Sequence, residues 1–142
     1  MKLSTRSTYG VRLMANLAQK WGGGPALLKE VAAEEEISEK YLSQIVIPLR
    51  SAGLLRSIRG ARGGYVLGAR PSEITLRQIV EVLEGGLDFV DEEAPTRPTH
   101  RVFQEIWSQM SQEMSRFLGS ITLEEVIQRA VERGTSSVMY HI

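Results

Sequence analysis

The chain of 142 residues contains no cysteine, so disulfides, thiol nucleophiles and thiolate-bound metals are excluded. Its only histidines are His100 and His141, and no spacing places a serine or an aspartate with either of them. No apolar run approaches the length of a membrane span, and the first ten residues lack the apolar core of a signal peptide. These absences predict a cytoplasmic protein that is not an enzyme and does not act in a membrane.

Acidic residues are missing from one stretch, between Tyr41 and Ser72. The net charge of the whole chain is zero, but residues 1–70 hold 11 Lys+Arg against 5 Asp+Glu, and residues 71–142 hold 6 against 12. This asymmetry is typical of a nucleic-acid-binding half joined to a half with a different task. The acid-free stretch contains five arginines: Arg50, Arg56, Arg59, Arg62 and Arg70.

Residues 36–68 contain the pattern around which the chain is organised. Ser38 is a candidate N-cap, and the apolar residues after it recur at the spacing of one helix face: Leu42, Ile45, Val46 and Leu49. Pro48 predicts a bend or a loose final turn. The period then changes, which predicts strands over 54–59 and 65–67 joined by the glycine-rich turn 60–64.

A polar-faced helix followed by an arginine-bearing hairpin is typical of a recognition helix in a DNA major groove with a wing beside it. The alternative is a solvated basic face on an ordinary hairpin. Further helices are expected near 5–21, over 27–35 and over 75–84, and the second of these would complete a helix-turn-helix. The glycines of the turn do not precede a helix, so they lack the context of a nucleotide-binding loop.

Residues 101–118 predict a longer helix with an apolar stripe that a small domain cannot readily cover. Packing against a second subunit would bury it, and the alternative is that it folds back on its own domain. The side chains at its centre are Phe103, Ile106, Trp107, Met110, Met114 and Phe117. A capping box, Thr122-x-x-Glu125, predicts a last helix that ends near Arg133 because Gly134 stops it.

We therefore expect a DNA-binding domain over residues 1–84, a loop over 85–100, a dimerisation helix and C-terminal helix over 101–134, and a tail over 135–142. The loop holds acidic residues and His100, which in principle could ligate a divalent ion. A solvated acidic run is the more ordinary interpretation, and we expect no metal site. The residues concerned are Asp91, Glu92, Glu93 and His100.

Three segments carry a family resemblance: KLSTRSTYGVRLM, ISEKYLSQIVIPLRSAGLL and, most specifically, RSIRGARGGYVLG. They resemble the Rrf-two family of bacterial winged-helix repressors over essentially the whole chain. The resemblance implies a mainly α fold with a small β-hairpin, a winged helix-turn-helix in each subunit of a homodimer, and a long helix that crosses to the partner. We expect double-stranded DNA with a palindromic operator as ligand, contacted by Ser38, Lys40, Tyr41, Ser43, Gln44, Arg56, Arg59 and Arg62.

Members of this family that sense iron–sulfur clusters carry three cysteines in the loop that corresponds to residues 87–100, and this chain has none. His100 matches the histidine that follows those cysteines. The acidic loop, the ITLEEV-type last helix and the tail resemble instead the members that repress cysteine-metabolism genes. That resemblance implies no cofactor and cysteine synthase as a partner, held by Tyr140 and Ile142 of the tail. The alternatives are a cluster- or ligand-responsive regulator of the same fold and a protein-interaction module that does not bind DNA.

Overall fold

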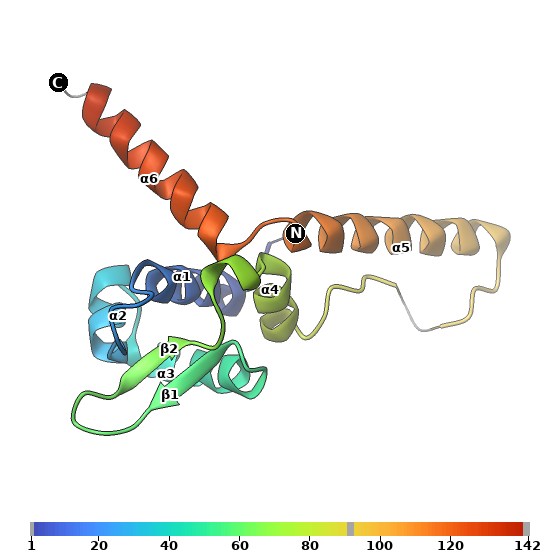
Figure 1. Ribbon diagram of the computed structural model, residues 1–142. Coiled ribbons are helices and arrows are strands. Elements are labelled where there is room, and N and C mark those ends of the chain that lie inside the picture. The colour runs from blue at the N-terminus through green and yellow to red at the C-terminus, as the bar shows by residue number, and fades with distance from the viewer. Residues whose placement is uncertain (1, 91–92, 141–142) are drawn as a thin grey trace.

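The computed structural model describes residues 2–90 and 93–140, with side chains as far as residue 134. The first part of the chain forms α1 (Thr5–Gln19), α2 (Leu28–Glu35), α3 (Glu39–Ser51) and the strands β1 (Leu55–Ile58) and β2 (Gly64–Leu67). The short helix η1 (Pro71–Glu73) leads to α4 (Leu76–Glu84), followed by α5 (Pro98–Gly119) and α6 (Leu123–Tyr140). Figure 1 shows α1 to α4 and the hairpin gathered together, while α5 and α6 project from them in different directions. The predicted fold class is confirmed.

The turn between α2 and α3 is made by Glu36, which adopts the left-handed conformation with a φ of 57°. Ile37 is buried beside it, and its N–H donates to the carbonyl of Ala32. Ser38 then caps α3, because its hydroxyl oxygen accepts a hydrogen bond of 3.3 Å from the N–H of Tyr41. The predicted N-cap is confirmed, and α3 continues through Pro48 to Ser51.

The hairpin is antiparallel, with Leu55 opposite Leu67 and Ile58 opposite Gly64. The segment before α2 adds one further pair to β2, since Ala26 and Tyr65 exchange backbone hydrogen bonds of 3.0 and 2.8 Å. Gly64 has a φ of +155°, and a Cβ there would lie 2.5 Å from the carbonyl oxygen of Ala26. Glycine is therefore required at the turn end of β2, where the hairpin meets the segment before α2.

One hydrophobic core lies between α1, α3 and α4. Leu13, Leu42, Leu49 and Ile79 are fully buried in it, and Leu123 at the start of α6 is buried in the same cluster. Burial of such side chains is the main source of stability for a domain of this size. The predicted apolar face of α3 is the one that packs into this core.

The two ends of the winged domain are joined through Glu84, the last residue of α4. Its Oε1 accepts hydrogen bonds from the Ser7 hydroxyl (2.6 Å), the Ser4 hydroxyl (2.7 Å) and the Ser4 N–H (2.9 Å). These bonds, the one from Ser7 first, lower the pKa of Glu84, and the nearby charge of Arg6 acts in the same direction. The carboxylate is thereby held at the N-terminus of α1, where negative charge is favourable.

The start of α6 is tied to the start of α4. The N–H of Leu76 donates to the carbonyl of Ile121 and the N–H of Leu123 donates to the carbonyl of Ile74, both at 2.9 Å. Thr75 caps α4 in a capping box with Gln78. The two segments before α4 and α6 therefore form a short antiparallel bridge.

The predicted capping box of α6 is half confirmed. Thr122 accepts from the N–H of Glu125 at 3.1 Å, but the Glu125 carboxylate pairs with Arg129 at 2.7 Å instead of returning to the helix start. The predicted end of α6 was wrong: the helix runs through Gly134 to Tyr140. A glycine inside a helix costs about 1 kcal/mol relative to alanine, which a helix of this length tolerates.

The loop before α5 is shorter than predicted. Pro98 occupies the first turn of α5, where its missing N–H would have no partner in any case, so the helix starts early. His100 consequently lies in α5 and not in the loop. Within the described part of the chain, no helix is both long enough and apolar enough to cross a membrane.

Candidate nucleic-acid interface

The outer face of α3 carries the polar side chains that the sequence predicts as DNA contacts. Lys40, Ser43 and Gln44 are exposed, and their spacing places them on the side opposite the buried face of the helix. Ser43 donates a hydrogen bond of 2.6 Å to the carbonyl of Lys40, so its oxygen is still free to accept. The amide of Gln44 can both donate and accept, which is the chemistry that an adenine edge requires.

Two further predicted contacts are partly engaged by the protein itself. Ser38 uses its oxygen as the cap of α3, which leaves its hydroxyl hydrogen able to donate. Tyr41 is half-buried and its ring packs edge-on against Tyr9, with 5.5 Å between the ring centroids. Tyr9 also lies under the guanidinium of Arg12. The structure therefore gives Tyr41 a packing role in addition to any contact with DNA.

The wing brings positive charge to a site beside α3. Arg59 precedes the turn of the hairpin and Arg62 lies within it. Both are exposed, and none of the ion pairs among the described residues involves either of them. Uncompensated guanidinium groups on a projecting hairpin are suited to phosphate oxygens or to a minor groove. The positions of these two arginines are therefore compatible with the predicted contacts to DNA.

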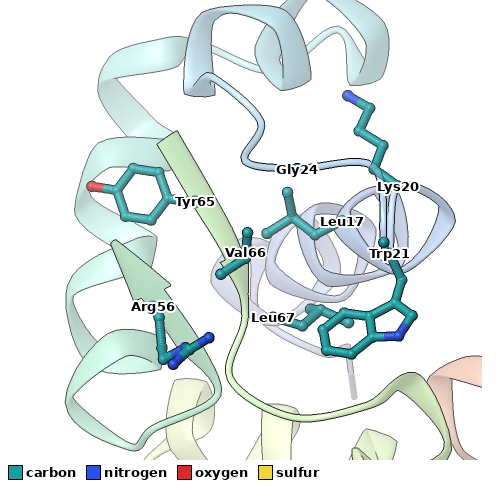
Figure 2. A pocket seen from close by; sticks show the side chains of 9 residues that line it. Leu17, Lys20, Trp21, Gly24, Arg56, Tyr65, Val66 and Leu67 are labelled. Atoms are coloured by element: carbon teal, nitrogen blue, oxygen red, sulfur yellow. The ribbon is translucent and has the colours of Figure 1, made fainter. Parts of the chain in front are cut away.

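Arg56 lies differently, within β1 instead of at the turn. Figure 2 shows its side chain beside a cavity of about 330 Å³ between the end of α1 and the hairpin, together with Trp21 and Tyr65. Val66, its partner across the hairpin, lines the same cavity. Arg56 is therefore set back from the turn that carries the other two arginines, and its role as a DNA contact is the least supported of the three.

Ile47 also lies on the outer face of α3, and it is not among the predicted DNA contacts. It is 62% exposed and follows Lys40, Ser43 and Gln44 at helical spacing. The sequence marks this position, because a large aliphatic side chain stands on a helix face whose other residues are polar.

The predicted dimer contacts form a surface on α5 that we call the α5 stripe: Phe103, Ile106, Trp107, Met110, Met114 and Phe117. Its methionines are half-buried, whereas Phe103, Trp107 and Phe117 are 53%, 43% and 65% exposed. Phe103 and Trp107 stack at a centroid distance of 6.3 Å. The stripe does not fold back on its own domain in this single chain, contrary to the alternative considered from the sequence.

The side of α5 next to the stripe rests on the segment after α4. Ser111 is buried and accepts a hydrogen bond of 3.0 Å from the N–H of Phe89, while Leu87 is buried nearby. Among the side chains that the structure describes, no three His, Asp or Glu residues form a group suited to a metal ion. Asp91, Glu92 and Ile142 lie outside the described residues, and Tyr140 is the last residue of α6.

A helix-turn-helix followed at once by an antiparallel hairpin defines a winged-helix protein. The family model Rrf2, described as an iron-dependent transcriptional regulator, matches residues 3–129, and the chain belongs to this family. CymR of Bacillus subtilis (strain 168), an HTH-type transcriptional regulator, is 45% identical over 126 residues, which cover 89% of each chain.

Solved structures of transcriptional regulators show the same similarity. One of CymR, described as the global cysteine regulator of B. subtilis, has a TM-score of 0.79 and 43% identity, covering 91% of this chain and 98% of its own. T. potens IscR has a TM-score of 0.77 and 38% identity, covering 92% of this chain and 88% of its own. These relatives are transcriptional regulators, a class of proteins that bind DNA and are not enzymes.

The family description names iron, so the donor set of this chain matters. Iron–sulfur clusters are held mainly by cysteine thiolates, and the chain has no cysteine. His100 is exposed in the first turn of α5, and a single imidazole cannot hold a cluster. The residues present therefore do not fit an iron–sulfur cluster.

Proposed function

We propose that this protein is a homodimeric transcriptional repressor that binds a palindromic operator and controls genes of cysteine and sulfur metabolism. The observation that carries the proposal is the exposed face of α3 beside a wing whose Arg59 and Arg62 lack ion pairs within the described residues. The polar side chains of that face supply base and phosphate contacts, and the wing supplies charge. The acid-free stretch between Tyr41 and Ser72 covers the wing and α3 after its first turn, so Glu39 is the one carboxylate that these two elements carry.

A dimer follows from the α5 stripe. Large aromatic side chains about half exposed on a long projecting helix are unfavourable in water, and a second copy of α5 related by a two-fold axis buries them. Two-fold symmetry gives two recognition helices and two wings, so the operator is an imperfect palindrome with one half-site per subunit.

The assignment to sulfur metabolism rests on the similarity to CymR over 89% of the chain and on the absence of cysteine. Without cluster ligands the signal comes from a partner or a small molecule. We propose cysteine synthase as the partner, bound through the C-terminal Ile142 with Tyr140 as a second anchor. Backbone N–H groups of the enzyme can orient a terminal carboxylate, and an apolar pocket can bury the aliphatic side chain beside it.

Capture of genomic DNA tests the function. The purified protein is mixed with fragmented genomic DNA, and the retained fragments are sequenced. We expect one palindromic motif next to genes of cysteine and sulfur uptake. Gln44→Ala should lose the motif, whereas the control Arg77→Ala, which removes an exposed arginine of α4, should retain it. A motif next to iron–sulfur assembly genes would favour a cofactor-responsive regulator, and the absence of salt-sensitive DNA binding would favour a protein-interaction module.

Deletion of Ile142 tests the partner. The shortened protein should remain a dimer with unchanged operator affinity but lose binding to cysteine synthase in a calorimetric titration. The full-length complex should dissociate when O-acetylserine, the substrate of that enzyme, is added. Equal affinity of the two forms for the enzyme, with no competition by the substrate, would refute the tail mechanism and leave the proposal of DNA binding intact.

A further inference from the structure

Ile47 is the exposed aliphatic side chain on the recognition face of α3. It is 62% exposed, whereas the apolar side chains on the other face of the helix, from Leu42 to Leu49, are at most 4% exposed. The structure describes every residue of α3, and within this helix no other large apolar side chain is exposed. Ile47 therefore interrupts a face that is otherwise polar.

Single exposed aliphatic residues are common on protein surfaces and often have no task. The position of Ile47 argues for one. It stands three residues after Gln44 and four after Ser43, so the three side chains form one continuous strip. A β-branched residue also favours a helix less than leucine or alanine does, and this one is largely unburied in its own chain. Neither folding nor packing accounts for the choice.

The major groove of DNA offers one apolar group on its base edges, the 5-methyl group of thymine. The other groups there are hydrogen-bond donors and acceptors, which polar side chains such as Ser43 and Gln44 can satisfy. An isoleucine in the groove has only apolar surface to offer. We infer that Ile47 binds the 5-methyl group of one thymine in each operator half-site, an inference that rests on the proposed function as a DNA-binding protein.

The geometry of α3 limits where that thymine lies. Side chains of a helix lean toward its N-terminus, so Ile47 extends over the turn that carries Ser43 and Gln44. Three helical residues rise about 4.5 Å, close to the roughly 3.4 Å between base pairs. Gln44 and Ile47 therefore reach neighbouring base pairs when α3 lies along the groove. The stiff χ1 of isoleucine keeps its methyl groups in place at small entropic cost.

The test starts from an operator selected by the wild-type protein from a randomised duplex library. In the selected duplex, each invariant thymine is replaced singly by deoxyuridine, which removes only the methyl group and keeps the base pair. We expect the wild type to lose affinity about fourfold at one position in each half-site, the equivalent of one buried methylene. Ile47→Ala should bind the thymine duplex more weakly and show no difference between thymine and deoxyuridine at that position.

The variant should fold, because the side chain is exposed and alanine is the residue most favourable to a helix. Ile47→Val, which shortens the side chain by one methylene, should show intermediate discrimination. If a motif is selected but no deoxyuridine weakens the wild type, the inference is refuted and the proposed function stands. Full discrimination by Ile47→Ala would also refute it, since another side chain must then hold the methyl group. If no motif is selected at all, the proposed function fails together with this inference.

Discussion

Trp107 provides a quantitative test of the dimer. The single chain leaves 43% of this residue exposed, and its ring stacks on Phe103 within the α5 stripe. A tryptophan buries up to roughly 250 Å² when fully enclosed, so a partner subunit can cover about 100 Å² of it. At about 25 cal/mol per Å² this burial contributes roughly 2.5 kcal/mol in each subunit.

A two-fold axis repeats the contact, so Trp107→Ala should destabilise the dimer by about 5 kcal/mol and raise its dissociation constant by between roughly three and four orders of magnitude. Sedimentation velocity from nanomolar to high micromolar protein measures that constant directly. Gln112→Ala is the matched control, because Gln112 is exposed on the opposite side of α5. A wild type that is monomeric at micromolar concentration would refute the reasoning, as would an unchanged constant for Trp107→Ala.

Four further predictions concern the wing, the Glu84 contact, α6 and the glycine that follows β2. Arg59→Ala should weaken operator binding by about 1–3 kcal/mol in a fluorescence titration; an equal loss on random DNA would make it a phosphate contact only, and an unchanged affinity would exclude it. Because the pKa of Glu84 is lower in the folded protein than in the unfolded chain, its ionised carboxylate stabilises the fold. This stabilisation is complete above the unfolded-state pKa and is lost as the pH falls through the folded-state pKa. Thermal unfolding of Glu84→Gln, which keeps an accepting oxygen, should therefore depend less on pH in the acid range than that of the wild type, and parallel curves would contradict this. Gly134→Ala should raise helicity and stability by up to about 1 kcal/mol, because the position is helical and its Cβ meets open space. Gly68→Ala should unfold the protein at lower temperature, because its Cβ would overlap the carbonyl oxygen of Gly53.

The helix-turn-helix and the wing could be predicted because local rules decide them. A serine cap followed by apolar residues at helical spacing specified α3, and glycines between two short apolar runs specified the hairpin. The exposed face of α3 followed from the same periodicity. The identity of the α5 stripe could also be predicted, since a helix with apolar residues at spacings of three and four needs a covering surface.

Other features depend on contacts that the local pattern does not contain. The bonds from Ser4 and Ser7 to Glu84 join residues about 80 positions apart, and no spacing rule pairs them. The helical state of Gly134 was missed because glycine is a frequent stop signal, and whether a helix continues past it depends on the sum of its neighbours. The cavity beside Arg56 arises from the approach of α1 to the hairpin, which only the tertiary structure determines.

The bridge between the segments before α4 and α6 restricts the spacing of the operator half-sites that a dimer can bind. Because the N–H of Leu76 donates to Ile121 and the N–H of Leu123 donates to Ile74, the end of α5 is fixed to the winged domain without a flexible hinge. In a dimer joined through α5, the two recognition helices then keep one separation and one relative orientation. One base pair inserted between the half-sites would displace the second by about 3.4 Å and rotate it by roughly 35°. A rigid dimer can adapt to this change only by distorting itself or the DNA, which costs binding free energy. The length of the spacer therefore identifies a genuine operator as strictly as the bases on either side of it.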